Sequence, residues 1–152
     1  MTARPGVLVV GYGNPLRGDD AVGWRVAESI VSDPRLAGAH VMTAHQLLPE
    51  LAVELGEAGL AVLVDARVGE PPGSISVMHV APCAGSSSPF GHQLTPAALA
   101  ALAQTVAGRS ADVVVVSIGI ESTEPGTGLS HAVADAVPSA REVVADLVLA
   151  HA

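Results

Sequence analysis

The segment Val7–Gly23, VLVVGYGNPLRGDDAVG, constrains the fold of this chain more than any other. Its first four residues, Val7–Val10, form an unbroken apolar run, which is typical of a strand buried on both faces in a parallel sheet. The glycines that follow let the chain turn at the carboxyl end of this strand, where open α/β sheets bind their ligands. Two carboxylates, Asp19 and Asp20, stand in the same turn. We therefore expect a metal or acid/base site there rather than a phosphate site.

The rest of the chain is expected to alternate strands with helices. Apolar runs and period-2 alternation predict strands at His40–Thr43, Leu60–Val64, Gly73–Val80 and Val113–Ile120, the alternating third of these at a sheet edge. Helical patterns and caps predict helices at Ala21–Val31, near Pro49–Gly56 with Pro49 in the first turn, from Thr95 to about Ala107, and from Ser130 to about Ala150. Pro138 is expected to kink or split the last helix. This order predicts a three-layer α/β/α sandwich with a mostly parallel sheet.

Length, charge and cysteine content exclude several classes of protein. The 152 residues show no repeat or domain boundary, so we expect residues 1–152 to form a single domain. A net charge of −8 without a cluster of basic residues excludes a nucleic-acid partner. The single cysteine, Cys83, excludes an internal disulfide and a thiolate metal cage. With no signal peptide and no run near the roughly 18 apolar residues that span a bilayer, we expect a cytoplasmic protein with no membrane partner.

Three candidate metal ligands each follow a different element: Asp20, Asp65 and His92. The two aspartates follow parallel strands and are expected at the same edge of the sheet. Two carboxylates and an imidazole suit nickel, zinc or cadmium, and three protein ligands leave positions open for water or substrate. Each residue also has a purely structural interpretation. Asp20 could cap the helix that follows it, Asp65 could bond its own loop backbone, and His92 could be an ordinary surface or core histidine.

The glycine-rich turn resembles the pattern G-x-G-N-x-L-x-x-D-[DE]-G-x-G of the hydrogenase maturation proteases. The matching residues are Gly11, Gly13, Asn14, Leu16, Asp19, Asp20 and Gly23, with Ala21 where the family usually has glycine. Further similar segments follow in the family's order: HQLLPEL from His45, VDA from Val64, HQL from His92 and GIE from Gly119. Members of this family are endopeptidases that clip a C-terminal extension from the nickel-loaded large subunit of nickel–iron hydrogenases.

The resemblance implies a fold, a site and a substrate. The fold would be a phosphorylase/hydrolase-like, five-stranded sheet of order 2-1-3-5-4, with strand 4 antiparallel. Asp20, Asp65 and His92 would be the metal-binding and catalytic residues, with Asp20 standing where the family often has glutamate. The metal would be nickel supplied by the large-subunit precursor, with zinc or cadmium as surrogates, and we expect the protease to be a monomer. A substrate groove is expected to include Asn14, Arg17, Asp19, His45, Arg67 and Glu121.

The residues favour metal-dependent peptide hydrolysis, with other functions left open. No Gly-x-Ser-x-Gly, His-Glu-x-x-His or activated cysteine is present, so covalent catalysis lacks its parts. The acids could instead act as an aspartic-protease-like pair without metal. A dinucleotide-binding module is disfavoured, because Gly11 and Gly13 are followed by Leu16 where that motif needs glycine. A non-catalytic, nickel-sensing chaperone would use the same ligands and remains an alternative.

Overall fold

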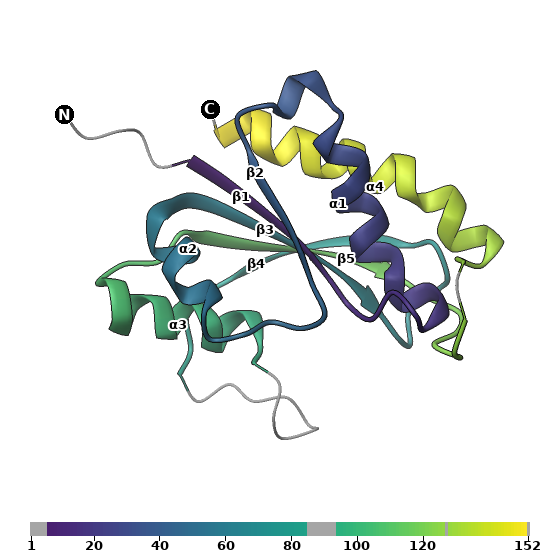
Figure 1. Ribbon diagram of the computed structural model, residues 1–152, viewed down its shortest axis with the longest axis horizontal. Coiled ribbons are helices and arrows are strands. Elements are labelled where there is room, and N and C mark those ends of the chain that lie inside the picture. Colours follow the sequence, from purple (N-terminus) through teal and green to yellow (C-terminus); the bar gives the residue numbers. More distant parts are fainter. Residues whose placement is uncertain (1–5, 85–93, 127, 152) are drawn as a thin grey trace.

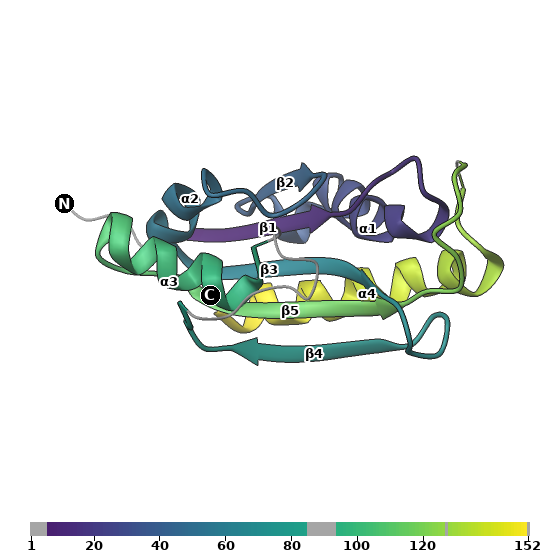
Figure 2. The same cartoon turned by 90° about the horizontal axis from the view of Figure 1, so that it is seen from below.

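A five-stranded mixed sheet forms the centre of the molecule (Figure 1). The computed structural model describes residues 6–84, 94–126 and 128–151. The strand order is β2-β1-β3-β5-β4, and β4 alone among these strands runs antiparallel, as its opposed arrow in Figure 2 shows. The bounds are β1 Gly6–Tyr12, β2 His40–Ala44, β3 Ala58–Arg67, β4 Ile75–Val80 and β5 Asp112–Gly119. The expected order and the antiparallel edge strand are confirmed.

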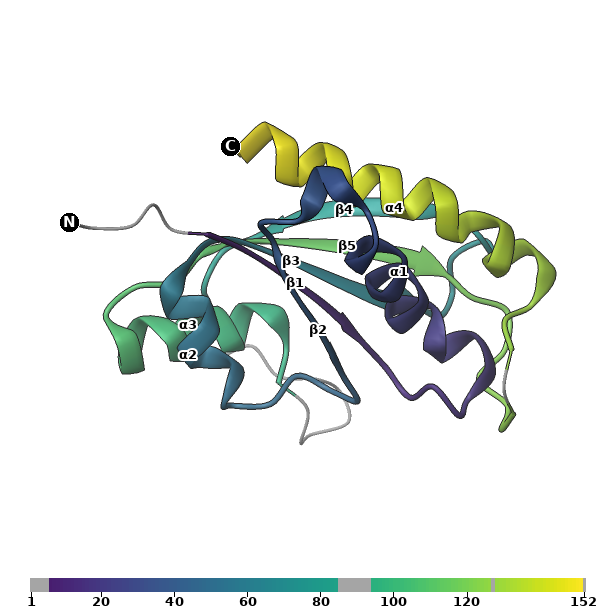
Figure 3. The ribbon, with the colours of Figure 1, turned by 45° about the horizontal axis from the view of Figure 1, so that its top comes forward.

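Helices cover both faces of the sheet, which confirms the three-layer architecture. Helices α1 (Val22–Val31) and α4 (His131–His151) lie on one face, and α2 (Leu51–Glu57) and α3 (Pro96–Ala107) lie on the other (Figure 3). Thr95 caps α3 by accepting a hydrogen bond from the Ala98 amide, and Pro96 occupies its first turn. No helix in the described ranges is long and apolar enough to cross a bilayer.

Alternate residues of the central strands enter two separate hydrophobic cores. Val9, Val62 and Val114 face α1 and α4, whereas Leu8, Leu63 and Val113 face α2 and α3. Only 2% of the residues are aromatic, and both cores consist of aliphatic residues: valine, leucine and alanine in both, with three isoleucines in the core under α1 and α4. Burying each such valine or leucine contributes about 1.5–3 kcal/mol. The strand patterns are therefore fixed by burial on both faces of the sheet.

Two glycines bring α1 unusually close to the sheet. A Cβ atom on Gly11 would overlap the backbone carbonyl of Gly23, and one on Gly23 would lie 2.5 Å from the Val64 carbonyl oxygen. No side chain separates the first turn of α1 from the ends of β1 and β3 at these points. The turn between β1 and α1 is thereby held against the carboxyl edge of the sheet.

Three local expectations are wrong. Strand β3 continues past Val64 to Arg67, because its last residues pair with Ser117–Gly119 of β5. Helix α4 runs unbroken through Pro138, so the expected split is absent: Pro138 and Ala134 are both exposed, and water can reach the Ala134 carbonyl that loses its helical partner. Helix α2 begins at Leu51, so Pro49 precedes the helix instead of opening it.

Candidate functional site

Three neighbouring strands end in polar residues on the face that α2 and α3 cover. Strand β1 ends in Tyr12, β3 carries Asp65 near its end, and β5 carries Ser117 directly opposite Asp65 in register. Each polar residue continues the period-2 face that runs through the core, as in Leu8, Val10 and Tyr12. The hydrophobic face of the sheet thus becomes polar at its carboxyl edge.

Asp65 is partly buried and held by two hydroxyl donors. The Tyr12 hydroxyl donates a hydrogen bond of 2.7 Å to Oδ2 of Asp65, and the Ser117 side chain also hydrogen-bonds to this carboxylate. Burial raises the pKa of Asp65 above its ordinary value, although these bonds and the Arg67 charge oppose the rise. Burial also raises the pKa of Tyr12, with a further contribution from Asp65. A carboxylate that water solvates this poorly gains strongly from a bound cation.

Asp20 lies in the short 3-10 turn Gly18–Ala21 that precedes α1. Its Oδ2 atom accepts a hydrogen bond of 2.7 Å from the Asn14 amide across the turn. The expectation that Asp20 caps α1 is wrong, because the cap residue is Ala21 and it receives no side-chain hydrogen bond. Ala21 has a φ of −77°, so the turn needs no glycine there, as expected from the sequence.

Gly13 gives this turn its shape. Its φ is +142°, a region that favours glycine, and a Cβ atom on Gly13 would overlap the carbonyl oxygen of Asp20. The chain therefore folds back on itself between Gly13 and Asp20. This fold, together with the Asn14 bond, sets the position of the Asp20 carboxylate.

Asp20 and Asp65 line one cavity of about 200 Å³, which we call the Asp20–Asp65 cavity. Its described lining comprises Tyr12, Gly13, Asp20, His45, Gln46, Leu47, Asp65, Ala66 and Leu94. The charge of Asp20 contributes to the raised pKa of Asp65, which places the two carboxylates within electrostatic reach of each other. Two carboxylates that line one small cavity favour a bound cation.

The third expected ligand, His92, lies outside the described residues. Among the residues that the structure does describe, no three His, Cys, Asp or Glu side chains lie close enough together to hold a metal ion. His45 lines the Asp20–Asp65 cavity and packs edge-on against Trp24, with ring centroids 5.4 Å apart. The described part of the chain thus supplies two carboxylates, which are common metal ligands. These two residues alone do not complete the coordination sphere of a metal ion.

Asp19 does not line the expected substrate groove. It is 1% exposed, and its carboxylate accepts hydrogen bonds from the backbone amides of Glu121, Ser122 and Ser130 and from the Ser130 hydroxyl, at 2.6–3.2 Å. Burial alone would raise the pKa of Asp19, but these bonds hold it below its ordinary value. Asp19 joins the turn before α1 to the loop between β5 and α4.

Of the other expected groove residues, some stabilise the local structure and others are exposed at the surface. Asn14 stabilises its own turn, because its Oδ1 accepts a hydrogen bond from the Leu16 amide. Arg17 is exposed and donates to the Thr123 carbonyl, and the exposed Glu121 binds Asp19 through its amide. These three residues do not line the Asp20–Asp65 cavity in the described structure. Arg67 borders a second cavity next to it.

This second cavity, which we call the Arg67 cavity, has a volume of about 440 Å³. Its described lining comprises Asp65, Arg67, Met78, Val80, Thr95, Pro96, Ala97, Val115 and Ser117. Asp65 therefore lies between a small polar cavity and a larger, mainly apolar one. Both cavities lie at the carboxyl edge of the parallel strands, where the topology places binding sites.

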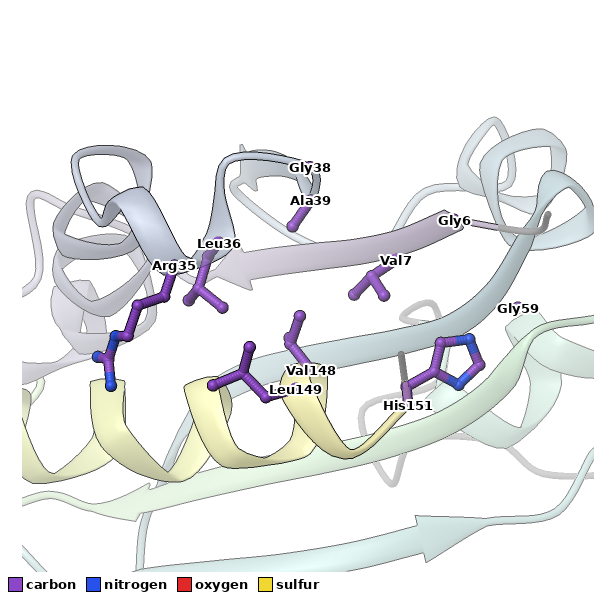
Figure 4. Close-up of a pocket in the computed structure, with 10 residues that line it drawn as sticks. All are labelled: Gly6, Val7, Arg35, Leu36, Gly38, Ala39, Gly59, Val148, Leu149 and His151. Atoms are coloured by element: carbon purple, nitrogen blue, oxygen red, sulfur yellow. The ribbon is translucent and has the colours of Figure 1, made fainter. Parts of the chain in front are cut away.

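Another cavity, of about 460 Å³, lies at the opposite end of the sheet (Figure 4). Glycines and aliphatic side chains make up most of its lining, with Arg35 and His151 at its margin. Arg35 is already bound by Asp33 and Glu142. Its described lining contains no carboxylate, unlike that of the Asp20–Asp65 cavity.

Tyr12 and Ser117 are site residues that sequence reasoning missed. The signal was present: each extends an alternating strand face, and each aligns with Asp65 once the strand order is known. Tyr12 occupies an unspecified position of the glycine motif, and Ser117 lies inside an apolar run. Only the register of β1, β3 and β5 brings them to Asp65.

The sheet order, the antiparallel edge strand and the covering helices define the fold seen in hydrogenase maturation proteases. HybD, a hydrogenase maturating endopeptidase from E. coli, matches with a TM-score of 0.71 and 21% identity over 91% of this chain and 89% of that one. HycI, a [NiFe] hydrogenase maturation protease from Thermococcus kodakarensis, matches with a TM-score of 0.74 and 21% identity over 97% and 94%. A hydrogenase 2 maturation peptidase from a Thaumarchaeota archaeon matches with a TM-score of 0.70 and 21% identity over 94% and 97%.

Sequence-level comparisons add no further relative: no protein-family model and no curated protein sequence matches the chain. The resemblance expected from the motifs is thus confirmed at the level of the fold.

Proposed function

We propose that this chain is a hydrogenase maturation protease. It removes the C-terminal extension of the large-subunit precursor of a nickel–iron hydrogenase, and it acts once nickel is in place in that precursor. One observation carries the proposal: Asp20 and Asp65 line a single cavity at the carboxyl edge of a sheet with the fold of these endopeptidases. The motifs around both aspartates resemble those of the family.

Asp20, Asp65 and His92 are the residues that we assign to nickel recognition. The substrate's nickel would polarise the scissile carbonyl and lower the pKa of a bound water. Asp20 keeps one oxygen on the Asn14 amide, and a carboxylate has a second oxygen for a metal. Tyr12 and Ser117 orient Asp65, whose carboxylate accepts the proton of the attacking water. A precursor without nickel would lack the cation that holds it to this acidic cavity.

A phosphate ligand fits this turn poorly. In a dinucleotide-binding turn, backbone amides point at the phosphate. Here the Asn14 amide is occupied by the Asp20 carboxylate, which would repel a phosphate group. The acid pair therefore favours a cation over a nucleotide.

The decisive experiment is a processing assay. Purified protein is incubated with a nickel-loaded large-subunit precursor, and the mass of the large subunit is followed. We expect loss of the C-terminal extension with the wild-type chain and none with Asp65→Asn. Asp112→Asn is the matched control, because Asp112 is an exposed aspartate at the start of β5, at the opposite edge of the sheet. It should process like the wild type.

Other outcomes separate the alternatives. Stoichiometric binding of an intact precursor would favour the nickel-sensing chaperone. Full processing by Asp65→Asn would remove Asp65 from the mechanism. Equal processing of nickel-free precursor would exclude nickel recognition and favour the metal-free acid pair. If the chain neither binds nor processes any precursor, the proposal is overturned.

A further inference from the structure

The Arg67 cavity begins where the Asp20–Asp65 cavity ends. Asp65 lines both, and Ser117, which hydrogen-bonds to Asp65, lines the second. A peptide whose reacting carbonyl lies at Asp65 would therefore have neighbouring residues at the Arg67 cavity. This inference rests on the proposed protease function.

The lining of the Arg67 cavity is mainly apolar, and its charged or polar members are Asp65, Arg67, Thr95 and Ser117. Met78 and Val80 of β4, Val115 of β5, and Pro96 and Ala97 of α3 supply apolar surface. Arg67 supplies a guanidinium group, which donates hydrogen bonds to carbonyl or carboxylate oxygens. A volume of about 440 Å³ is within the range of small-molecule sites. It is large enough for one bulky side chain, and its cation suits the backbone carbonyl beside that side chain.

Strand alternation separates the cavity from the opposite face of the same strand. Met78 and Val80 point toward α3, whereas Val77 points to the other face of the sheet and does not line the cavity. Met78 is 51% exposed and Val77 is 45% exposed. Two neighbours of similar exposure thus differ in whether they can touch a ligand in this cavity.

We propose that the Arg67 cavity is a specificity pocket that binds a large apolar side chain of the substrate beside the scissile bond. Arg67 binds a backbone carbonyl of the same segment. The pocket selects the cleavage site by apolar burial, while the acids next to it act on the peptide bond. Continuity with the proposed site through Asp65 identifies the occupant as the substrate chain, in preference to an unrelated ligand.

The test compares Met78→Asp with the matched control Val77→Asp. Each variant processes two pairs of nickel-loaded precursors, and within each pair a large apolar residue is compared with glycine at one of the two positions that flank the cut. In one of the two pairs, the wild type should prefer the apolar precursor at least tenfold in kcat/KM, since pockets of this kind discriminate by that much or more. Met78→Asp should abolish the preference by slowing the apolar precursor alone. Val77→Asp should keep it.

A second variant guards against misfolding. Ala97→Phe fills the cavity from α3 and should also remove the preference, with an unchanged far-UV circular dichroism spectrum. If Met78→Asp and Ala97→Phe both keep the wild-type preference for the apolar precursor, the proposed specificity pocket is overturned, while the proposed protease function is unaffected. If Val77→Asp loses the preference for the apolar precursor as fully as Met78→Asp does, the proposed specificity pocket is also overturned. Failure of the wild-type chain to process any precursor would instead overturn the proposed function, and the pocket with it.

Discussion

Tyr12 fixes one half of the candidate site through a single hydroxyl group. Its hydrogen bond of 2.7 Å to Asp65 joins the ends of β1 and β3 on the face that α2 and α3 cover. Hydrogen bonds to charged groups are worth about 1.5–3 kcal/mol. The bond therefore limits the orientations open to the Asp65 carboxylate.

The substitution Tyr12→Phe should lower kcat/KM for precursor processing roughly tenfold, because it removes this bond and keeps the ring. The melting temperature, followed by circular dichroism, should change by only a few degrees. Processing at the wild-type rate would show that Ser117 alone suffices to orient Asp65.

Asp19 and Asp20 are adjacent in sequence and opposite in role. Asp19 is buried and saturated by donors from the loop between β5 and α4, whereas Asp20 lines the cavity. Because both residues are aspartates in the same turn, the sequence alone could not show which one is buried and which one lines the cavity. The donors to Asp19 come from more than 100 positions away, and only the tertiary fold brings them there.

The variant Asp19→Asn should reduce the free energy of unfolding by about 2 kcal/mol at pH 7, because buried amide donors lose their charged acceptor. The pKa of Asp19 is lowered in the folded state. Its contribution is therefore complete above the pKa of the unfolded chain and is lost as the pH falls through the folded value. Urea unfolding between pH 7 and pH 2 should show a smaller acid-induced loss of stability for Asp19→Asn than for the wild type. Parallel pH profiles would contradict this assignment.

At the scale of elements, the close approach of α1 to the sheet depends on Gly11 and Gly23. The variant Gly11→Ala should destabilise the fold by about 1–3 kcal/mol or more, because its Cβ would meet backbone atoms that cannot yield. Gly38→Ala is the matched control, since a Cβ there has no heavy atom within 4 Å. Denaturant unfolding of both variants tests this, and equal stabilities would exclude tight packing at Gly11.

Strands were more predictable from the sequence than helix termini. Buried apolar runs such as Val7–Val10 leave few alternatives, so the strand positions are confirmed. The end of β3 was missed because Asp65, Ala66 and Arg67 carry no strand signal of their own and are held by pairing with β5. The cap of α1 was missed because the Asp20 carboxylate binds the Asn14 amide instead of the helix. Such competition between local partners is decided by tertiary structure.

At the scale of the whole molecule, two hydrophobic cores share one sheet. Val62 points into one and Leu63 into the other, with no break in the backbone between them. Neither core can lose its strands without the other, so we expect them to unfold together.

The variants Val62→Ala and Leu63→Ala should each lower the midpoint of a single unfolding transition, with Leu63→Ala costing about 2–5 kcal/mol. Near-UV and far-UV circular dichroism should give coincident melting curves for both. Two separate transitions would show that the layers fold independently.

The meeting of Asp20 and Asp65 at one cavity follows from topology. Parallel neighbours β1 and β3 end at the same edge, so acids that follow or end these strands must approach each other. The apolar cavity beside them was not foreseen. It arises where α3 leaves part of the antiparallel strand β4 uncovered, and that depends on packing between elements distant in sequence.

The hydrogen bonds that Asp19 accepts from three backbone amides link the hydrogen exchange of those amides. The amides of Glu121, Ser122 and Ser130 lie at the two ends of an irregular loop, yet all three donate to one side chain. Any fluctuation that withdraws this acceptor exposes all three protons to solvent at once. They should share one opening free energy, as if they belonged to a single strand.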